Sequence, residues 1–257
     1  MTYLMQGGIP FFIPGGRVGC LLVHGFTASP QELRRMGEFL GSRGHTVLAV
    51  RLPGHSTSLA DLARMRHTDW LATVEDGYSY LRGICDAMVL VGLSLGGALS
   101  LIFAAERPVS AVVAMATPYE LPQRWYVRLL RPFLRPLSLV WRTMPKGPPD
   151  WRDPGAQKER VAYRAYPLRA ASEVDKALRT MREALRHVSV PVLLMHSRED
   201  DFAPPSSMPR IHSALASGDK SMVWIDHSNH IITCDISREQ VFSAAAAFVD
   251  RITKPRP

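Results

Sequence analysis

Ser94 stands in the sequence pattern that best indicates covalent chemistry in this chain. It lies in the run Gly-Leu-Ser-Leu-Gly over residues 92–96, with a further glycine directly behind. An apolar β-rich run precedes it and an Ala/Leu-rich run typical of a helix follows, so the pattern places the serine on a sharp strand-to-helix turn. The flanking glycines let neighbouring backbone pass close to such a turn. The hydroxyl would then project from the backbone and could attack a carbonyl carbon.

A serine hydroxyl is a poor nucleophile at neutral pH, so it needs a general base that is itself oriented by an acid. When the nucleophile sits on a strand-to-helix turn, the acid and the histidine follow it in that order along the chain. Two later β-rich runs end in suitable residues: residues 190–196 lead into Ser-Arg-Glu-Asp-Asp-Phe-Ala-Pro-Pro, and residues 221–226 lead into His-Ser-Asn-His.

Three carboxylates compete for the position of the acid, and two histidines compete for the position of the base. Asp200 is favoured over Glu199 and Asp201 because it begins a D-x-x-A-P run, whereas Asp201 is typical of a solvated loop charge. His230 is favoured over His227 because it follows in a Ser-x-His context ahead of two isoleucines.

The tetrahedral intermediate of acyl transfer carries an oxyanion, at which two backbone N–H groups should be aimed. We expect one from Leu95, the residue after the nucleophile, and the second from Phe26, in the turn after an early strand that reads Leu-Leu-Val-His-Gly-Phe-Thr. His24 is expected to brace that turn by hydrogen bonding. His196 falls inside a predicted buried strand and is expected to be a hydrogen-bonded core residue.

Six short β-rich runs alternate with helical patterns, which predicts an α/β fold with a mostly parallel sheet and helices on both faces. These runs span residues 19–24, 46–50, 88–92, 110–115, 190–196 and 221–226. A first helix is expected to begin at a Ser29 cap, with Pro30 and Glu32 in its first turn, and to end before Gly44. Further helices are expected over 68–84 and 237–251.

Residues 120–187 interrupt this alternation. They hold eight prolines and three tryptophans, and they carry 15 Lys and Arg against 7 Asp and Glu, which is the whole excess of +8. We expect short helices forming a lid over the carboxyl edge of the sheet, where open α/β sheets bind ligands. The core would then comprise residues 1–119 and 188–257.

A basic helical face in this lid is compatible with transient contact to anionic lipid surfaces, or with attraction of negatively charged substrates. An ordinary solvated helix explains the same pattern equally well. The residues concerned are Arg124, Arg128, Arg131 and Arg135. Nucleic acid is not expected as a partner, because no binding motif accompanies the charge.

The remaining patterns bear on metals and location. The H-E-x-x-H motif of a zinc helix is absent from the sequence, and we expect neither metal nor cofactor. Three cysteines at unrelated positions are typical of reduced thiols in a cytoplasmic protein, and the N-terminus lacks the pattern of a signal peptide. The uncharged stretch 87–105 would suit a transmembrane helix in length, but glycines and serines interrupt it at Ser94, which favours a buried strand and helix.

Taken together, these motifs resemble bacterial α/β-hydrolases, closest to the small carboxylesterases and monoacylglycerol lipases. The resemblance rests on LLVHGFTASP, RLPGHST, Asp69-Trp70 with the VEDGY run that follows, GLSLGG and SNHIITCD, and covers about residues 1–119 and 188–253. It implies an α/β-hydrolase fold with a small lid, and hydrolysis of esters with a short to medium acyl chain, or of monoglycerides. It also implies the same triad of Ser94, Asp200 and His230 and the same oxyanion hole.

The lid resembles the family least. Bacterial monoacylglycerol lipases carry an acid after Ala-Tyr, whereas this chain reads Ala-Tyr-Arg164, which puts a strict monoglyceride preference in doubt. Lysophospholipase, thioesterase or peptidase activity would use the same triad, because specificity lies in the lid and pocket. A non-catalytic ligand-binding protein on this scaffold is the alternative from another class.

Overall fold

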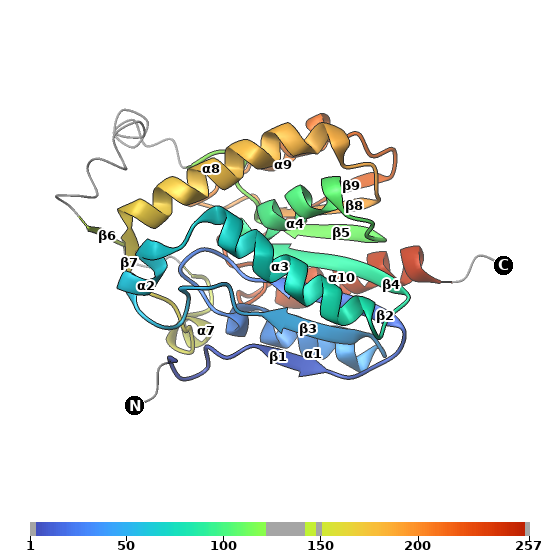
Figure 1. Cartoon of the computed structure of the whole chain (residues 1–257), viewed down its shortest axis with the longest axis horizontal. Helices are drawn as coiled ribbons and strands as arrows, with labels where there is room; N and C mark the ends of the chain where they lie inside the picture. The colour runs from blue at the N-terminus through green and yellow to red at the C-terminus, as the bar shows by residue number, and fades with distance from the viewer. Residues whose placement is uncertain (1–3, 122–141, 148–150, 255–257) are drawn as a thin grey trace.

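A seven-stranded sheet forms the centre of the chain, with strand order β1-β3-β2-β4-β5-β8-β9 (Figure 1). The computed structural model describes residues 4–121, 142–147 and 151–254. The strands of this sheet are β1 (Phe11–Ile13), β2 (Val18–Val23), β3 (Thr46–Val50), β4 (Ala87–Leu93), β5 (Ala111–Met115), β8 (Val192–Ser197) and β9 (Lys220–Ile225). All six predicted runs are confirmed as parallel strands. The strand that the sequence did not indicate is β1, a three-residue strand antiparallel to β3 at the edge.

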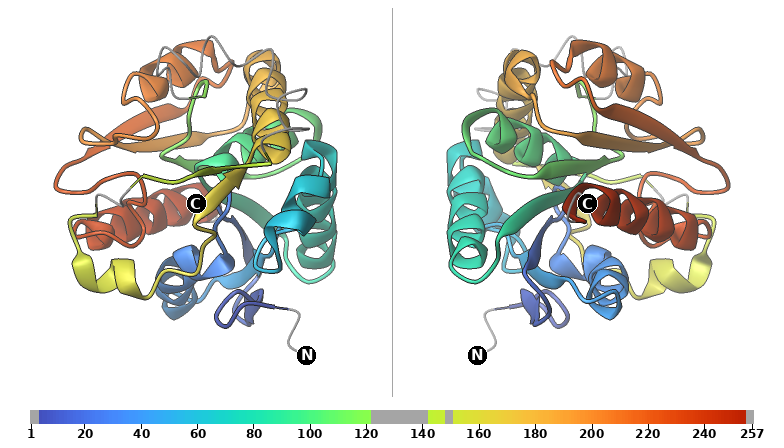
Figure 2. Two further views of the ribbon diagram at one scale, coloured as in Figure 1. Left: turned by 90° about the vertical axis from the view of Figure 1, so that its left-hand side faces the viewer. Right: turned by 90° about the vertical axis from the view of Figure 1, so that its right-hand side faces the viewer.

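The central strands are apolar on both faces because helices cover both sides of the sheet. In β4, Met88 and Leu90 point into one apolar cluster, while Val89 and Val91 point into the other. Figure 2 shows the two helical layers. One layer contains α1 (Arg34–Ser42) and α10 (Arg238–Thr253), and the other contains α3 (His67–Arg82), α4 (Leu95–Glu106) and α8 (Leu168–Ala184), with α2 (Leu59–Arg64) and α9 (Ser207–Ala214) beside it.

The predicted helices over 68–84 and 237–251 are confirmed as α3 and α10, whereas the start of the first helix was predicted wrongly. The chain makes a 3-10 turn over Pro30–Leu33 before α1 begins, and the buried Ser29 side chain makes no capping hydrogen bond. The Glu32 carboxylate does not complete a capping box, because it is engaged by Arg160 at 2.7 Å. Gly44 ends the helix as expected, with a φ of 88°.

The uncharged stretch over residues 87–105 divides into β4 and α4, as the sequence indicated. Among the described residues, no helix has the length and apolar character needed to cross a membrane.

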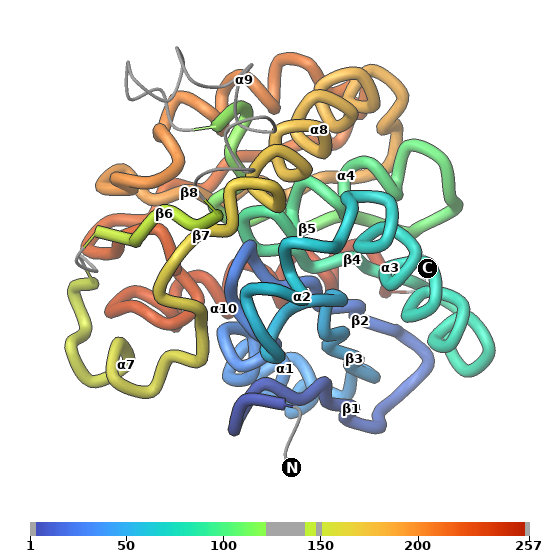
Figure 3. The backbone as a smooth tube through the Cα atoms, turned by 60° about the vertical axis from the view of Figure 1, so that its left-hand side comes forward, coloured from blue at the N-terminus to red at the C-terminus, as the bar shows by residue number. Residues whose placement is uncertain are grey.

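The described parts of residues 120–187 begin at the edge where the parallel strands end, and α8 runs from there back over the sheet (Figures 1 and 3). They form a two-stranded sheet of β6 (Thr143–Pro145) and β7 (Ala165–Pro167), a short helix α7 (Pro154–Lys158), the long helix α8 and a 3-10 turn over Leu185–His187. The arginines of the predicted basic helix, at 124, 128, 131 and 135, lie outside the described residues.

Helix α8 is packed as a core helix although it falls within the predicted lid. Its residues Val174, Leu178 and Met181 are buried in the same apolar cluster as Leu99 and Ile102 of α4. The lid over 120–187 remains a prediction, and this packing favours placing its C-terminal limit before Leu168.

Candidate active site

Four loops that follow parallel strands meet at the carboxyl edge of the sheet. Ser94 follows β4, residues 24–27 follow β2, Asp200 lies three residues beyond β8, and His230 lies five residues beyond β9. Because β2, β4, β5, β8 and β9 are adjacent and parallel, their carboxyl ends fall side by side. The sheet therefore gathers residues that lie far apart in the sequence, such as Ser94 and His230, which are separated by 136 positions.

Ser94 occupies a strained backbone position that its neighbours hold in place. Its φ of 54° lies in the left-handed region, and its N–H donates to the carbonyl of Met115 at 2.7 Å. A Cβ on Gly92 would lie 2.3 Å from the Gly96 oxygen, and a Cβ on Gly96 would lie 1.9 Å from the Val23 oxygen. Only glycine fits at either position, so the turn has the tight geometry that the sequence pattern indicated.

Ser94, His230 and Asp200 form one chain of hydrogen bonds. The Ser94 Oγ lies 2.9 Å from His230 Nε2, and His230 Nδ1 lies 2.7 Å from Asp200 Oδ2. The other Asp200 oxygen accepts from the N–H groups of Phe202 at 2.9 Å and Ala203 at 2.7 Å. With Asp200 ionised, Nδ1 donates to it, which leaves Nε2 free to accept the serine proton.

A second imidazole also contacts Asp200. His196 is buried, as predicted, and its Nε2 lies 3.0 Å from the Ala203 oxygen and 3.1 Å from Asp200 Oδ2. Burial acts to raise the pKa of Asp200, but the charge of His230 and the hydrogen bonds from both histidines outweigh it and hold that pKa well below its usual range. The sequence did not indicate this contact, although His196 at the end of β8, four residues before the acid, was the available signal.

The rival acids and the rival histidine lie outside this chain of hydrogen bonds. Glu199 accepts from the backbone N–H of His227 at 2.9 Å and from the Arg152 guanidinium at 2.8 Å. Asp201 is exposed, as predicted. Glu199 and His227 thus interact with one another in the loops around the site, while Asp200 contacts His230 and His230 contacts Ser94.

His24 holds the turn after β2, as the sequence predicted. Its Nδ1 donates to the Gly25 oxygen at 2.9 Å, and its Nε2 accepts from the N–H of Leu52 at 3.1 Å. Complete burial lowers the pKa of His24 to about 4, so the ring is neutral near pH 7. It therefore braces the turn without carrying charge.

The backbone N–H groups of Phe26 and Leu95 remain available at this turn. Within the described residues, neither donates to an acceptor of the protein. A Cβ on Gly25 would lie 3.4 Å from the Ser94 Cβ, so the turn after β2 passes directly beside the serine. Leu95 is also the first residue of α4, whose N-terminus favours negative charge. The arrangement suits stabilisation of an oxyanion.

The described residues line an open cavity of about 620 Å³ that includes Ser94. Three stacked aromatic rings cross one side: Phe26 and Tyr166 have centroids 6.0 Å apart, and Tyr166 and Phe202 have centroids 6.1 Å apart. Phe202 in turn lies 4.7 Å from the His230 ring. The segment containing α7, β6 and β7 supplies much of the remaining lining, including Lys146, which the sequence did not single out.

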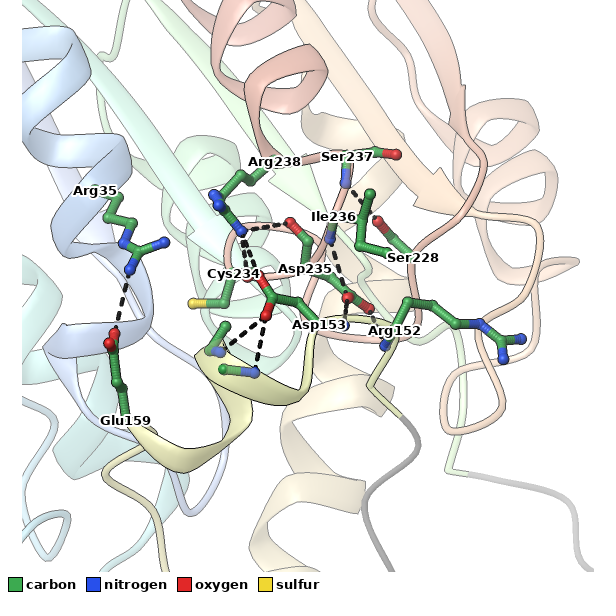
Figure 4. A network of polar contacts seen from close by, with 12 residues as sticks. Arg35, Arg152, Asp153, Glu159, Ser228, Cys234, Asp235, Ile236, Ser237 and Arg238 are labelled. Atoms are coloured by element: carbon green, nitrogen blue, oxygen red, sulfur yellow. Dashed lines mark hydrogen bonds and ion pairs between the residues drawn. The ribbon is translucent and has the colours of Figure 1, made fainter.

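A polar network ties the α7 segment to the loop that follows His230 (Figure 4). Asp235 accepts from the backbone N–H groups of Arg152 at 3.3 Å and Asp153 at 2.7 Å, and from that of Asn229 at 2.8 Å. Asp153 caps α7 and accepts from Arg238 at 2.8 Å. The cavity lining is thus anchored to the loop that carries the candidate base.

Comparison with known proteins agrees with this fold. Residues 20–245 match the α/β-hydrolase family. The chain belongs to the α/β-hydrolase family.

Individual relatives of this α/β-hydrolase are ester-cleaving enzymes. It is 28% identical over 246 residues to a thermostable monoacylglycerol lipase of Bacillus sp. strain H-257, covering 95% of both chains. It is 25% identical to a carboxylesterase of Bacillus subtilis strain 168, covering 95% of this chain and 96% of the relative. A solved structure from work on the metagenome-derived lipolytic enzymes LipS and LipT has a TM-score of 0.88 at 28% identity, covering 96% of this chain and 99% of that one.

Proposed function

We propose that this α/β-hydrolase is a serine ester hydrolase that cleaves acyl monoesters through an acyl-enzyme on Ser94. The observation that carries the proposal is the hydrogen-bonded chain of Ser94, His230 and Asp200 beside two unoccupied backbone N–H groups. The similarity to a monoacylglycerol lipase and a carboxylesterase supports the same class of substrate.

In the first half of the reaction, His230 Nε2 takes the hydroxyl proton while Ser94 Oγ attacks the ester carbonyl carbon. The carbonyl oxygen becomes an oxyanion and accepts from the N–H groups of Phe26 and Leu95. Asp200 holds the Nδ1 proton of His230 and stabilises the imidazolium that forms. That imidazolium then gives its proton to the departing alcohol, which leaves the acyl group on Ser94.

In the second half, a water molecule takes the place of the alcohol beside His230. Nε2 removes one of its protons as the oxygen attacks the acyl carbon, and the same two N–H groups receive the second oxyanion. Collapse of this intermediate breaks the bond to Ser94 Oγ, which recovers its proton from His230. The carboxylic acid leaves, and the enzyme returns to its starting state.

Short- to medium-chain monoesters are the proposed substrates, and the cavity in front of Ser94 supports that size. A volume of about 620 Å³ falls within the ordinary range for small-molecule sites. Lysophospholipids and thioesters are the alternative substrates, since their cleavage requires the same nucleophile, base and oxyanion site.

Two measurements test the proposal. A fluorophosphonate probe should label the wild-type protein and fail to label Ser94→Ala, because the probe reacts only with an activated serine. A panel of p-nitrophenyl esters from acetyl to palmitoyl, with 1-monolauroyl glycerol, a lysophospholipid, a thioester and a triglyceride, then assigns the substrate. Absence of labelling in a folded wild-type protein would leave a non-catalytic binding function as the correct one.

Two further proposals concern contact with lipid surfaces and the compartment in which the protein is found. The arginines of the predicted lid would attract anionic lipid surfaces. The test compares the activity of the wild type with that of Arg128→Glu/Arg131→Glu on vesicles of rising anionic content. Equal dependence in both proteins would overturn lipid contact. A reducing, cytoplasmic environment is supported by the free thiols of Cys20, Cys85 and Cys234.

A further inference from the structure

The lining of the active-site cavity is richer in cations than in carboxylates. Lys146, Lys158, Arg160 and Arg164 line it, against Glu32 and Asp201. Arg160 and Glu32 neutralise one another at 2.7 Å, and this carboxylate is almost wholly buried. Apart from this pair, three basic side chains and one acid, Asp201, remain in the lining.

Lys146 differs from Lys158 and Arg164 because it contacts the turn after β2, which carries the Phe26 N–H proposed for the oxyanion. Its Nζ donates to the Thr27 hydroxyl at 2.5 Å, and that hydroxyl donates to the Phe26 oxygen at 2.6 Å. The ammonium also lies 4.9 Å from the centre of the Tyr166 ring. It is thus held between the turn that stabilises the oxyanion and the aromatic side of the cavity.

The Lys146 ammonium has donors to spare. A lysine carries three N–H groups, and in the described part of the chain only the bond to Thr27 uses one. Among the described residues, no carboxylate forms an ion pair with it. Burial and repulsion from Arg160, opposed by Glu32, lower its pKa to about 7. Partial burial makes a cation less favourable where the described residues offer it no carboxylate, and an anion placed beside Lys146 would relieve that cost.

We propose that Lys146, with Arg164 and Lys158 of the same cavity lining, forms an anion subsite that selects esters carrying a carboxylate or phosphate a few bonds from the scissile carbonyl. The proposal rests on the ester hydrolase function above and specifies its substrate class. The anion occupies the side of the cavity beside Thr27, where Lys146 donates two charge-assisted hydrogen bonds. The acyl or alcohol chain lies along the rings of Tyr166 and Phe202.

Matched ester pairs test this subsite and distinguish its two positions. On the acyl side, p-nitrophenyl valerate is compared with mono-p-nitrophenyl glutarate. On the alcohol side, 1-lauroyl glycerol is compared with its 3-phosphate. Each kcat/KM is measured at about pH 6, where the ammonium is protonated. We expect wild type to favour the anionic member of at least one pair by about tenfold, as charge-assisted hydrogen bonds are worth.

Variants at Lys146 then show whether this side chain carries the preference. Lys146→Gln should lower the ratio of anionic to neutral kcat/KM by about tenfold, mainly through KM, whereas Lys146→Arg should retain it. Lys254→Gln removes a remote exposed charge and should leave the ratio unchanged.

The outcomes separate the two proposals. A ratio that is the same in wild type and Lys146→Gln, with the neutral esters hydrolysed, would overturn the subsite and leave the ester hydrolase function intact. Failure of folded wild type to hydrolyse any of the four esters, together with no fluorophosphonate labelling, would overturn the function itself and the substrate inference with it.

Discussion

Replacement of Gly96 by alanine tests the link between packing at the Ser94 turn and the proposed oxyanion site. The added Cβ would lie 1.9 Å from the Val23 oxygen and 2.8 Å from the His24 oxygen, distances that real Cβ atoms essentially never show. Both contacts are backbone atoms, so no side-chain rotation relieves them. Either α4 or the end of β2 has to move by about 1 Å, and that end leads directly into Phe26.

The effect on stability follows from two opposing terms. Overpacking of this kind costs about 1–3 kcal/mol, and a rigid backbone contact places it at the upper end. Alanine is a better helix former than glycine by about 1 kcal/mol, which offsets part of this. A net loss of about 2 kcal/mol corresponds to a fall in Tm of about 4–8 °C for a chain of this size.

The effect on activity should be larger than the effect on stability. A shift of the turn after β2 withdraws the Phe26 N–H from the oxyanion, and loss of one such donor lowers kcat by about 100-fold or more. The assay is kcat on p-nitrophenyl butyrate, with Tm followed by circular dichroism. A Gly96→Ala protein with wild-type kcat and Tm would refute the reasoning.

Two other glycines, Gly97 beside this turn and the remote Gly218, serve as controls. At Gly97 an added Cβ would meet the Thr117 Oγ1 at 2.0 Å, which is a side-chain atom, so Gly97→Ala should be rescued largely by adding Thr117→Ala. Gly218 has nothing within 4 Å of an added Cβ, and Gly218→Ala should match wild type in both measurements.

Three further predictions concern the charged and titratable groups. Asp200→Asn should lower kcat by about 10⁴-fold while the protein still folds, because the wrong tautomer of the base is then favoured; a loss under tenfold would contradict the assigned role. Arg160→Gln should destabilise the protein by about 3 kcal/mol in urea unfolding by stranding the buried Glu32, and Glu32→Gln/Arg160→Gln should recover most of it; equal stability of both variants would argue against a buried ion pair. His24 and His55 have pKa values lowered by burial, His24 to about 4, so the unfolded chain binds their protons first. Their stabilisation is complete above pH 6.5 and should fall by up to about 1.4 kcal/mol per pH unit for each group as the pH drops from 6.5 towards 4. A free energy of unfolding that stays constant over this range would exclude the buried neutral histidines.

Local sequence was sufficient to predict the six parallel strands and the helices α3 and α10. Six strands follow from short runs of β-branched and aliphatic residues, and α3 and α10 follow from apolar residues at helical spacing. The 3-10 turn before α1 was not predicted. The buried carboxylate of Glu32 pairs with Arg160, which is 128 residues away, whereas capping rules consider only residues that are close in the sequence. The edge strand β1 is too short to give a periodic signal.

Helix α8 shows a second limit of local reasoning. Its charged sequence and its place after a proline-rich segment indicated a lid helix, yet its apolar face packs against α4. Whether one face of α8 is buried depends on which helix lies opposite it, and the local sequence of α8 does not contain that information.

The sequence by itself determined which residues are candidates for the proposed chemistry. Gly92, Ser94 and Gly96 prescribe a strained turn through their own steric limits, and chain order narrows the acid and the base to a few residues each. Tertiary structure decided which carboxylate and which imidazole stand within hydrogen-bond reach, because distances of 2.7–2.9 Å depend on the register of adjacent strands. Only the tertiary structure shows that His196 contacts Asp200 and that Lys146 contacts Thr27. These contacts arise where the ends of separate segments converge at one edge of the sheet.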